Sequence, residues 1–219
     1  MEKKLSIEQI ALIEETLVLN GLKFDDLKLE LTDHIASEIE ELMEENTTSF
    51  EENFKVVFEK WSDQLRPSSS FWVGVLYSTP KIVMNKWVSI TKKTLLVSFV
   101  GSFILSFITS FFNNKSVFVI AMEGIKCLFI LVYGLYLVSY LLVLRSKTIT
   151  VFSHIYKRTW YLFFFYPFGY GLDSLPHHYN SEVFFSLFFP LGILITAFLY
   201  LMLAYKHIQF NKHLSLSNV

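Results

Sequence analysis

The residues best suited to chemistry near the start of the chain lie on one predicted helix. Glu30, His34 and Glu38 follow one another at intervals of four, so they share a helix face, and Asp33 adds a carboxylate beside them. Carboxylates and an imidazole can together bind a divalent metal ion. We favour a solvated, ion-paired face and predict no metal there, because residues 1–66 supply no second histidine and no cysteine.

A second polar group lies toward the ends of hydrophobic runs. Its members are Glu123, Lys126, Asp173, His177, His178 and Glu182. The two adjacent histidines and the two later acids could form an external metal site. Glu123 and Lys126 are three residues apart, so they can pair on one helix face. We interpret the group as a polar loop with interface anchors and assign it no metal.

No arrangement of residues typical of catalysis occurs. The sequence has no phosphate loop, no Gly-x-Ser-x-Gly and no His-Glu-x-x-His. The middles of the hydrophobic runs lack Asp, Glu, Lys, Arg and His, although pumps and transporters usually carry an ionisable residue there. We therefore predict that the protein is not an enzyme, with no catalytic residues and no cofactor. The lone Cys127 lies in an apolar run and predicts a packed thiol.

Charge divides the chain into two regions. Residues 1–66 hold 17 acidic and seven basic side chains, whereas the remainder holds three acidic and 12 basic ones. The second region also holds most of the 23 Phe and 11 Tyr. The split predicts an acidic domain in water followed by a hydrophobic domain in a membrane.

Three amphipathic helices are predicted in residues 1–66. Ser6 with Gln9, and Ser49 with Glu52, are typical capping boxes. Gly21 favours a helix stop, and the carboxylates of Asp25 and Asp26 suit the start of the second helix. Each helix has one apolar stripe, so the three should pack together, with Ile35, Phe54 and Trp61 buried.

A family resemblance comes from the second of these helices. The pattern Leu-x-x-Glu-Leu-x-Asp-His-Ile-x-x-x-Ile-Glu over residues 27–40 precedes a turn, and Ser49-Phe50-Glu51-Glu52 opens the next helix. Residues 5–65 thereby resemble the HAAS-type, or permease-prefix, domains at the N-terminus of bacterial multi-span membrane proteins. The resemblance implies a cytoplasmic regulatory or interaction module and transfers no catalytic residues. Asn46-Thr47-Thr48 replaces the usual glycine turn, and Trp61-Ser62 stands where Phe-Gly is frequent.

Residues 67–93 are predicted to be a linker followed by a basic amphipathic segment. Pro67 and Ser68-Ser69-Ser70 end the acidic domain, and Pro80 is typical of the first position of a helix. The apolar stretch 71–77 is too short to cross a bilayer. The residues expected to contact the membrane surface are Lys81, Lys86, Trp87, Lys92 and Lys93. Nucleic acid is not expected as a partner, because the acidic domain would repel phosphate.

Four transmembrane helices are predicted over residues 94–205, which gives an all-α protein. The runs are 94–112, 117–144, 160–172 and 183–205; the third is short and could instead be re-entrant. Basic residues gather before the first run, between the second and third, and after the fourth. The positive-inside rule then predicts a multi-pass protein of the cell inner membrane, with both termini, including the tail 206–219, in the cytoplasm.

These patterns favour a non-enzymatic integral membrane protein with a cytoplasmic helical interaction or regulatory domain, acting as a membrane-anchored regulator or sensor. We expect the lipid bilayer as one partner, and a protein bound to the N-terminal domain or a second copy of the chain as another. The alternative is a small transporter or transporter subunit.

Overall fold

The computed structural model describes residues 4–45, 48–111, 115–159 and 183–217, most of which are helical. They fall into two compact units. The first comprises residues 1–89 and 148–151, and the second residues 90–147 and 152–219. The predicted third run, 160–172, lies outside the described residues, and so do Asp173, His177, His178 and Glu182.

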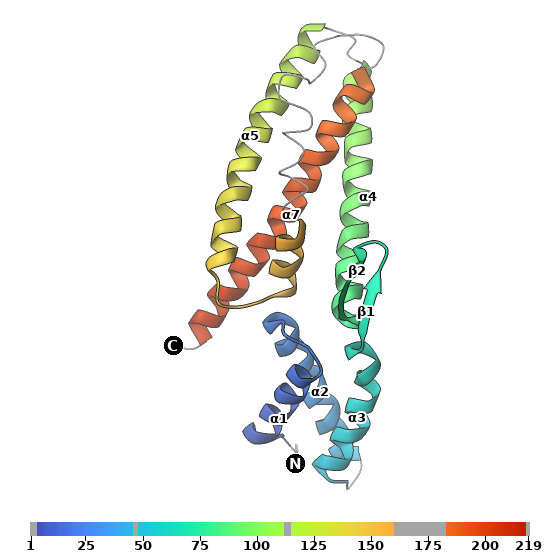
Figure 1. The fold of residues 1–219 in the computed structure, drawn as a ribbon, viewed down its shortest axis with the longest axis vertical. Coiled ribbons are helices and arrows are strands. Elements are labelled where there is room, and N and C mark those ends of the chain that lie inside the picture. Colours follow the sequence, from blue (N-terminus) through green and yellow to red (C-terminus); the bar gives the residue numbers. More distant parts are fainter. Residues whose placement is uncertain (1–3, 46–47, 112–114, 160–182, 218–219) are drawn as a thin grey trace. The chain divides into compact units, whose positions relative to one another are not determined.

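Three helices open the first unit, as the capping signals predict (Figure 1). They are α1 (Ile7–Leu19), α2 (Asp25–Glu45) and α3 (Phe50–Leu65). Both predicted capping boxes are present, at Ser6 with Gln9 and at Ser49 with Glu52. Gly21 follows α1 with φ +87°, a conformation that glycine adopts without a Cβ penalty. Both α1 and α3 pack against α2, so α2 is the central helix of the unit.

Apolar residues from all three helices form the core of this unit, and the predicted burial of Ile35 is confirmed. Ile13 and Leu17 of α1, Ile35 and Ile39 of α2, and Val57 of α3 are buried. Phe54 and Trp61 are only half-buried, which differs from the prediction. Trp61 lies at the edge of the core, where its Nε1 donates a hydrogen bond of 3.1 Å to Glu38. Its indole therefore needs a polar neighbour as well as apolar ones.

A β-hairpin stands where a linker was predicted. Strand β1 (Pro67–Ser70) pairs antiparallel with β2 (Gly74–Pro80), with Pro67 opposite Pro80 and Ser68 opposite Thr79. The register shifts between Ser68 and Ser70, and Gly74 has φ +111°. Pro80 is consequently the last residue of a strand, and the next helix, α4 (Lys81–Phe111), begins immediately after it.

The second unit holds most of α4 together with α5 (Lys115–Arg145), all but the first residue of a helix over 151–159, and α7 (Val183–Ser217). Helices α4, α5 and α7 are each long and apolar enough to cross a membrane. The predicted amphipathic segment and the first run form one continuous helix, α4. Helix α7 continues through most of the predicted tail and contains Pro190.

Small residues bring α4 and α7 close together. A Cβ added to Gly101 would lie 3.0 Å from Cδ1 of Ile195, and one added to Gly192 would lie 3.4 Å from Oγ of Ser102. Thr196 Oγ1 donates to Ser98 Oγ at 2.8 Å and also lies 2.8 Å from the Gly192 carbonyl oxygen. Close backbone approach with shared hydroxyl hydrogen bonds is typical of helix packing in membranes.

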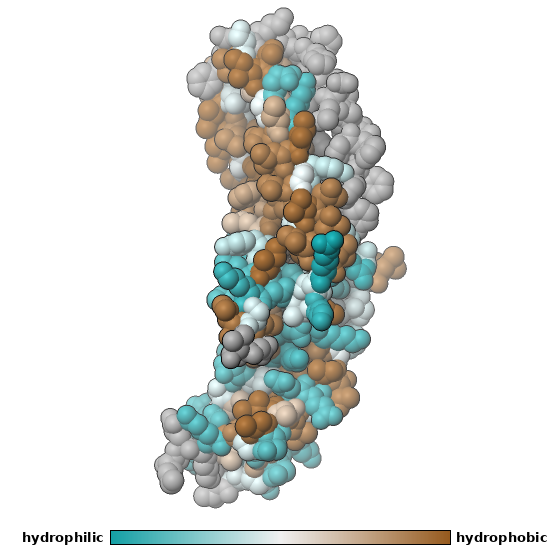
Figure 2. All heavy atoms as spheres, turned by 90° about the vertical axis from the view of Figure 1, so that its left-hand side faces the viewer, coloured by the Kyte–Doolittle hydropathy of each residue, from teal (hydrophilic) through white to brown (hydrophobic). Residues whose placement is uncertain are grey.

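Helices α5 and α7 share an apolar core. Phe118, Met122 and Ile125 of α5 are buried against Leu187 and Leu194 of α7. The outer side of α5 is apolar as well: large side chains such as Ile120, Ile130 and Leu131 are exposed, and Figure 2 shows hydrophobic residues gathered over much of this unit. Cys127 is among the exposed residues of α5, which corrects the predicted packed thiol. Exposed apolar side chains in such numbers suit a lipid environment.

Candidate docking interface

The acidic helices meet basic and backbone donors inside the first unit. One contact joins the end of α3 to the start of α4: Asp63 Oδ2 lies 2.6 Å from Lys81 Nζ. The backbone amide of Lys81 also donates to the Arg66 carbonyl at 2.9 Å. The hairpin makes this possible, because pairing of Pro67 with Pro80 returns the chain to the end of α3. The Lys81 ammonium lowers the pKa of the Asp63 carboxyl.

A second contact joins α2 to α4. Glu30 Oε2 lies 3.5 Å from Lys86 Nζ, with both side chains partly exposed. Ion pairs in such settings contribute at most about 1 kcal/mol and weaken as salt is added. The two ion pairs therefore orient the surface of α2 and α3 toward α4 and supply little stability.

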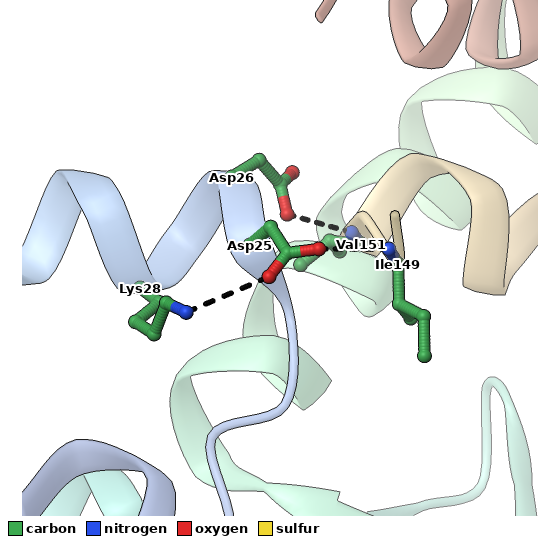
Figure 3. A network of polar contacts seen from close by, with 5 residues as sticks. All are labelled: Asp25, Asp26, Lys28, Ile149 and Val151. Atoms are coloured by element: carbon green, nitrogen blue, oxygen red, sulfur yellow. Dashed lines mark hydrogen bonds and ion pairs between the residues drawn. The ribbon is translucent and has the colours of Figure 1, made fainter. Parts of the chain in front are cut away.

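The third contact is the most specific and involves Asp25 and Asp26 at the start of α2 (Figure 3). Asp25 exchanges two hydrogen bonds with Ile149: its amide donates to the Ile149 carbonyl at 2.7 Å, and its Oδ2 accepts from the Ile149 amide at 2.9 Å. Asp26 Oδ1 accepts from the Val151 amide at 2.9 Å. Val151 is the first residue of helix 151–159, so its amide has no acceptor within that helix.

These two aspartates thus cap another segment of the chain. Asp26 takes the part of an N-capping side chain supplied from a distance, and a carboxylate also suits the positive end of the helix dipole. Asp25 is also 3.6 Å from Lys28 Nζ in the next turn. Thr150 and Val151 are fully buried, so side-chain packing accompanies the hydrogen bonds.

Burial makes Asp26 the unusual carboxylate of this surface. Loss of water raises its pKa above the ordinary 3.8, while the Val151 amide and Lys86 act in the opposite direction. Its Oδ2 is buried and has no hydrogen-bond partner within the described ranges. Ionised Asp26 is therefore held at a cost, which would be removed by protonation or by separation from residues 148–151.

The structure distributes the predicted membrane-contact residues among different environments. Lys81 and Lys86 pair with carboxylates, and Lys92 and Lys93 are exposed further along α4. Trp87 is only 4% exposed and packs against the ring of Tyr77, with 6.0 Å between ring centroids. Its indole thus belongs to the interior of the first unit, which corrects its predicted place on the surface.

The other predicted polar groups can be placed in part. Lys126 Nζ lies 2.8 Å from Glu123 Oε1, which confirms their predicted pairing on one helix. On α2, Glu38 accepts from Lys60 and from Trp61, and Glu30 pairs with Lys86. Glu30 and Glu38, one turn on either side of His34, are therefore engaged with cationic or N–H groups. Among the described residues, no three His, Cys, Asp or Glu side chains gather as a metal site would require.

Sequence reasoning missed residues 148–151 as a partner of the acidic helices. Asp25 and Asp26 are identifiable as helix-start residues. Nothing in the local sequence indicates that their carboxylate oxygens accept hydrogen bonds from amides more than 120 positions away. The only signal in the sequence is the short run Thr148-Ile149-Thr150-Val151, which is uncharged, is apolar at alternate positions and follows the basic residues Arg145 and Lys147. No protein-family model, curated protein or solved structure matches the chain.

Proposed function

We propose that the chain is a membrane-anchored, non-enzymatic regulator whose acidic helical domain switches between a docked and a free state. In the docked state, Asp25, Asp26, Glu30 and Asp63 hold the domain to α4 and to residues 148–151. The observation that carries the proposal is the pairing of Asp25 and Asp26 with the backbone of Ile149 and Val151. These bonds tie the domain to the segment between α5 and the next hydrophobic run.

The membrane arrangement belongs to the same proposal. Helices α4, α5 and α7 cross the bilayer, residues 160–172 supply a fourth crossing, and the acidic domain and both termini lie in the cytoplasm of a bacterial cell. The support is the length and composition of the three helices and the distribution of basic residues along the sequence. The resemblance of residues 5–65 to HAAS-type domains agrees with a cytoplasmic regulatory role.

Anionic lipid and the acidic domain compete for the same lysines, and this competition sets the balance between the docked and the free state. Anionic lipid attracts Lys81, Lys86, Lys92 and Lys93, and two of these lysines pair with the acidic domain when it is docked. Short tethering keeps the domain at a high effective concentration near α4, so weak contacts suffice to populate the docked state. Release would expose the carboxylates of α2 and α3 to a protein partner or a second copy.

Docking is tested by hydrogen exchange of the full chain reconstituted in lipid vesicles. The amides of Ile149 and Val151 should be protected in the wild type, because Asp25 and Asp26 are their acceptors. Asp25→Ala with Asp26→Ala should abolish that protection. Asp33→Ala, which removes an exposed carboxylate of the same helix, should leave it unchanged. If both amides exchanged as fast in the wild type as in the Asp25→Ala, Asp26→Ala variant, docking would be refuted.

Topology is tested separately with reporter fusions. Reporters placed after Val219 and within residues 174–180 should lie on opposite sides of the membrane. Reporters on the same side would mean that residues 160–172 do not cross. The alternative function, a small transporter, would be favoured if purification from membranes retained a solute or ion instead of a protein.

A further inference from the structure

The tip of the β-hairpin carries several large apolar side chains that are exposed. Phe71 is 88% exposed, Leu76 95%, Val75 67% and Trp72 51%. The turn is built by the Val73 amide, which donates to the Ser70 carbonyl at 3.2 Å. Aromatic and aliphatic side chains therefore stand together at one end of a short ribbon.

Both faces of the hairpin are apolar at this end. Successive strand residues point to opposite faces, so Val75 and Leu76 lie on different sides of β2, and both are exposed. Tyr77 lies on the same side of β2 as Val75 and packs its ring against Trp87 of α4. An edge that docked on a folded protein surface would need only one apolar face, whereas insertion into a lipid interface suits two.

The contact between Tyr77 and Trp87 also fixes the direction of the hairpin. Strand β2 ends at Pro80 and α4 begins at Lys81, so a contact between Tyr77 and Trp87 requires the strand to fold back beside the first turns of α4 (Figure 1). The six residue-to-residue steps from Gly74 to Pro80 cover about 20 Å as a strand, which equals the rise of about 13 residues of α-helix. Thirteen residues after Lys81, α4 reaches Thr94, where its charge-free run begins.

We infer that the hairpin tip, residues 71–76, is a membrane-docking element that inserts into the lipid interface beside α4. The inference rests on the proposed crossing of the bilayer by α4. Trp72 and Tyr77 suit the headgroup level, while Phe71, Val75 and Leu76 reach the upper acyl region. A two-stranded ribbon has unpaired edges, so it stays in the interface and does not enter the hydrocarbon. The exposed Lys92 and Lys93 of α4 favour an anionic lipid surface at the same depth.

Insertion is tested on the full chain in vesicles of phosphatidylcholine with phosphatidylglycerol. The exposed Cys127 is first replaced by Ser, and a fluorophore is attached to Val75→Cys or, as a control, to Glu44→Cys at the end of α2. Nitroxide carried on lipid should quench the label at position 75, and iodide in the buffer should not. The label at position 44 should behave in the opposite way.

Two serine variants separate insertion from general loss of apolar surface. Phe71→Ser with Leu76→Ser should remove lipid quenching at position 75, because the tip no longer gains from leaving water. Ile7→Ser with Leu19→Ser removes comparably exposed apolar side chains from α1 and should leave the quenching intact. Serine variants of the tip that keep full lipid quenching would overturn the inference.

The remaining outcomes are also decisive. A label at position 75 that iodide quenches as readily as the control would show a tip in water. A label shielded from both quenchers would show that protein, such as a second copy, covers the tip. Either result overturns insertion. Flotation with the vesicles tests the spans independently: wild type and tip variant should both float, and a wild type that does not float would refute the membrane crossing itself.

Discussion

The interactions that stabilise the first unit differ from those that stabilise the second, although α4 contributes residues to both units. In the first unit, apolar side chains fill the interior while charged pairs such as Asp63–Lys81 and Glu30–Lys86 lie at its partly exposed surface. In the second unit, α4 meets α7 through glycines and the hydroxyl pair Ser98–Thr196. Apolar residues occupy the outside of that unit as well as its interior.

The difference follows from the solvent that each unit suits: water for the first unit and lipid for the second. Water drives apolar side chains into the first unit and screens its ions, so charges there guide orientation more than they stabilise. Lipid is as apolar as leucine, so helices in it associate through close packing and internally satisfied polar groups. The difference can be broken or sharpened by substitutions that affect one kind of contact at a time.

The largest effect is expected from Ile35→Ala in the first unit. Ile35 is fully buried in α2, and a large-to-small change in a core costs about 2–5 kcal/mol. A loss of that size is comparable with the whole stability of a small domain. Proteolysis of the full chain should then release residues 1–66 selectively. Resistance equal to that of the wild type would show that α2 is not the centre of the core.

A smaller loss is expected from Gly101→Leu in the second unit. A Cβ at this position would already lie 3.0 Å from Cδ1 of Ile195, so a leucine would have to displace that side chain, and overpacking costs about 1–3 kcal/mol. Gly124→Leu is the matched control, because nothing lies within 4 Å of a Cβ added there. Thermal unfolding in detergent, followed by circular dichroism, should show a lower midpoint for the first variant only. Equal shifts in both would count against the close contact between α4 and α7.

Removal of the hydroxyl pair should have a still smaller effect. Ser98→Ala with Thr196→Val deletes a hydrogen bond of the kind that averages about 0.6 kcal/mol in membrane proteins. The unfolding midpoint in detergent should fall slightly and by the same amount at low and high salt.

A different salt dependence is expected for Lys86→Gln in the first unit. This substitution should lower the unfolding midpoint at low salt and leave it unchanged at high salt, because salt screens the Glu30–Lys86 pair. A salt-dependent shift of the midpoint in the Ser98–Thr196 variant would contradict the claim that α4 and α7 associate through uncharged contacts.

The smallest expected effect is a change of docking with pH. Burial raises the pKa of Asp26, so its contribution is complete below its ordinary value of 3.8 and is lost as the pH rises through the docked-state value. Lys81 lowers the pKa of Asp63, whose contribution is present above 3.8 and is lost as the pH falls further. From these two groups, docking should strengthen from neutral pH toward 3.8 and weaken below it.

The protection factor of the Val151 amide measures this dependence. Asp26→Asn is the decisive variant, since its amide oxygen can still accept from Val151 while the ionisation is gone. Protection in this variant should stay flat between neutral pH and the ordinary pKa of Asp26. A wild type whose protection falls on acidification from neutral pH would contradict the assigned role of Asp26.

Local sequence signals predicted local structure well. The capping residues Ser6 and Ser49, the stop at Gly21 and the pair Glu123–Lys126 each depend on neighbours within a few positions, and all four appear as expected. Hydrophobic runs likewise predicted the three long apolar helices. Their interactions are set by periodicity and composition, which a sequence displays directly.

Tertiary contacts were missed wherever two distant segments define the outcome. The hairpin was read as a linker because Ser68-Ser69-Ser70 has low strand propensity, yet its partner strand carries Val75 and Tyr77. The burial of Trp87 was not predicted, because it involves a contact with Tyr77 that the amphipathic pattern of residues 81–93 does not reveal. The capping of Val151 by Asp26 joins positions 125 residues apart, a pairing that no local pattern specifies.

The lengths of the helices carry a consequence for the bilayer itself. Helix α5 has 31 residues and α7 has 35, so they are about 46 and 52 Å long, whereas the hydrocarbon core is about 30 Å thick. If these helices cross the bilayer as proposed, each one extends beyond the hydrocarbon or tilts within it. A thicker or thinner membrane would be met by a change of tilt, and tilt displaces the helix ends. Under the proposed crossing, membrane thickness would therefore set where both ends of α5 and α7 lie with respect to the lipid headgroups.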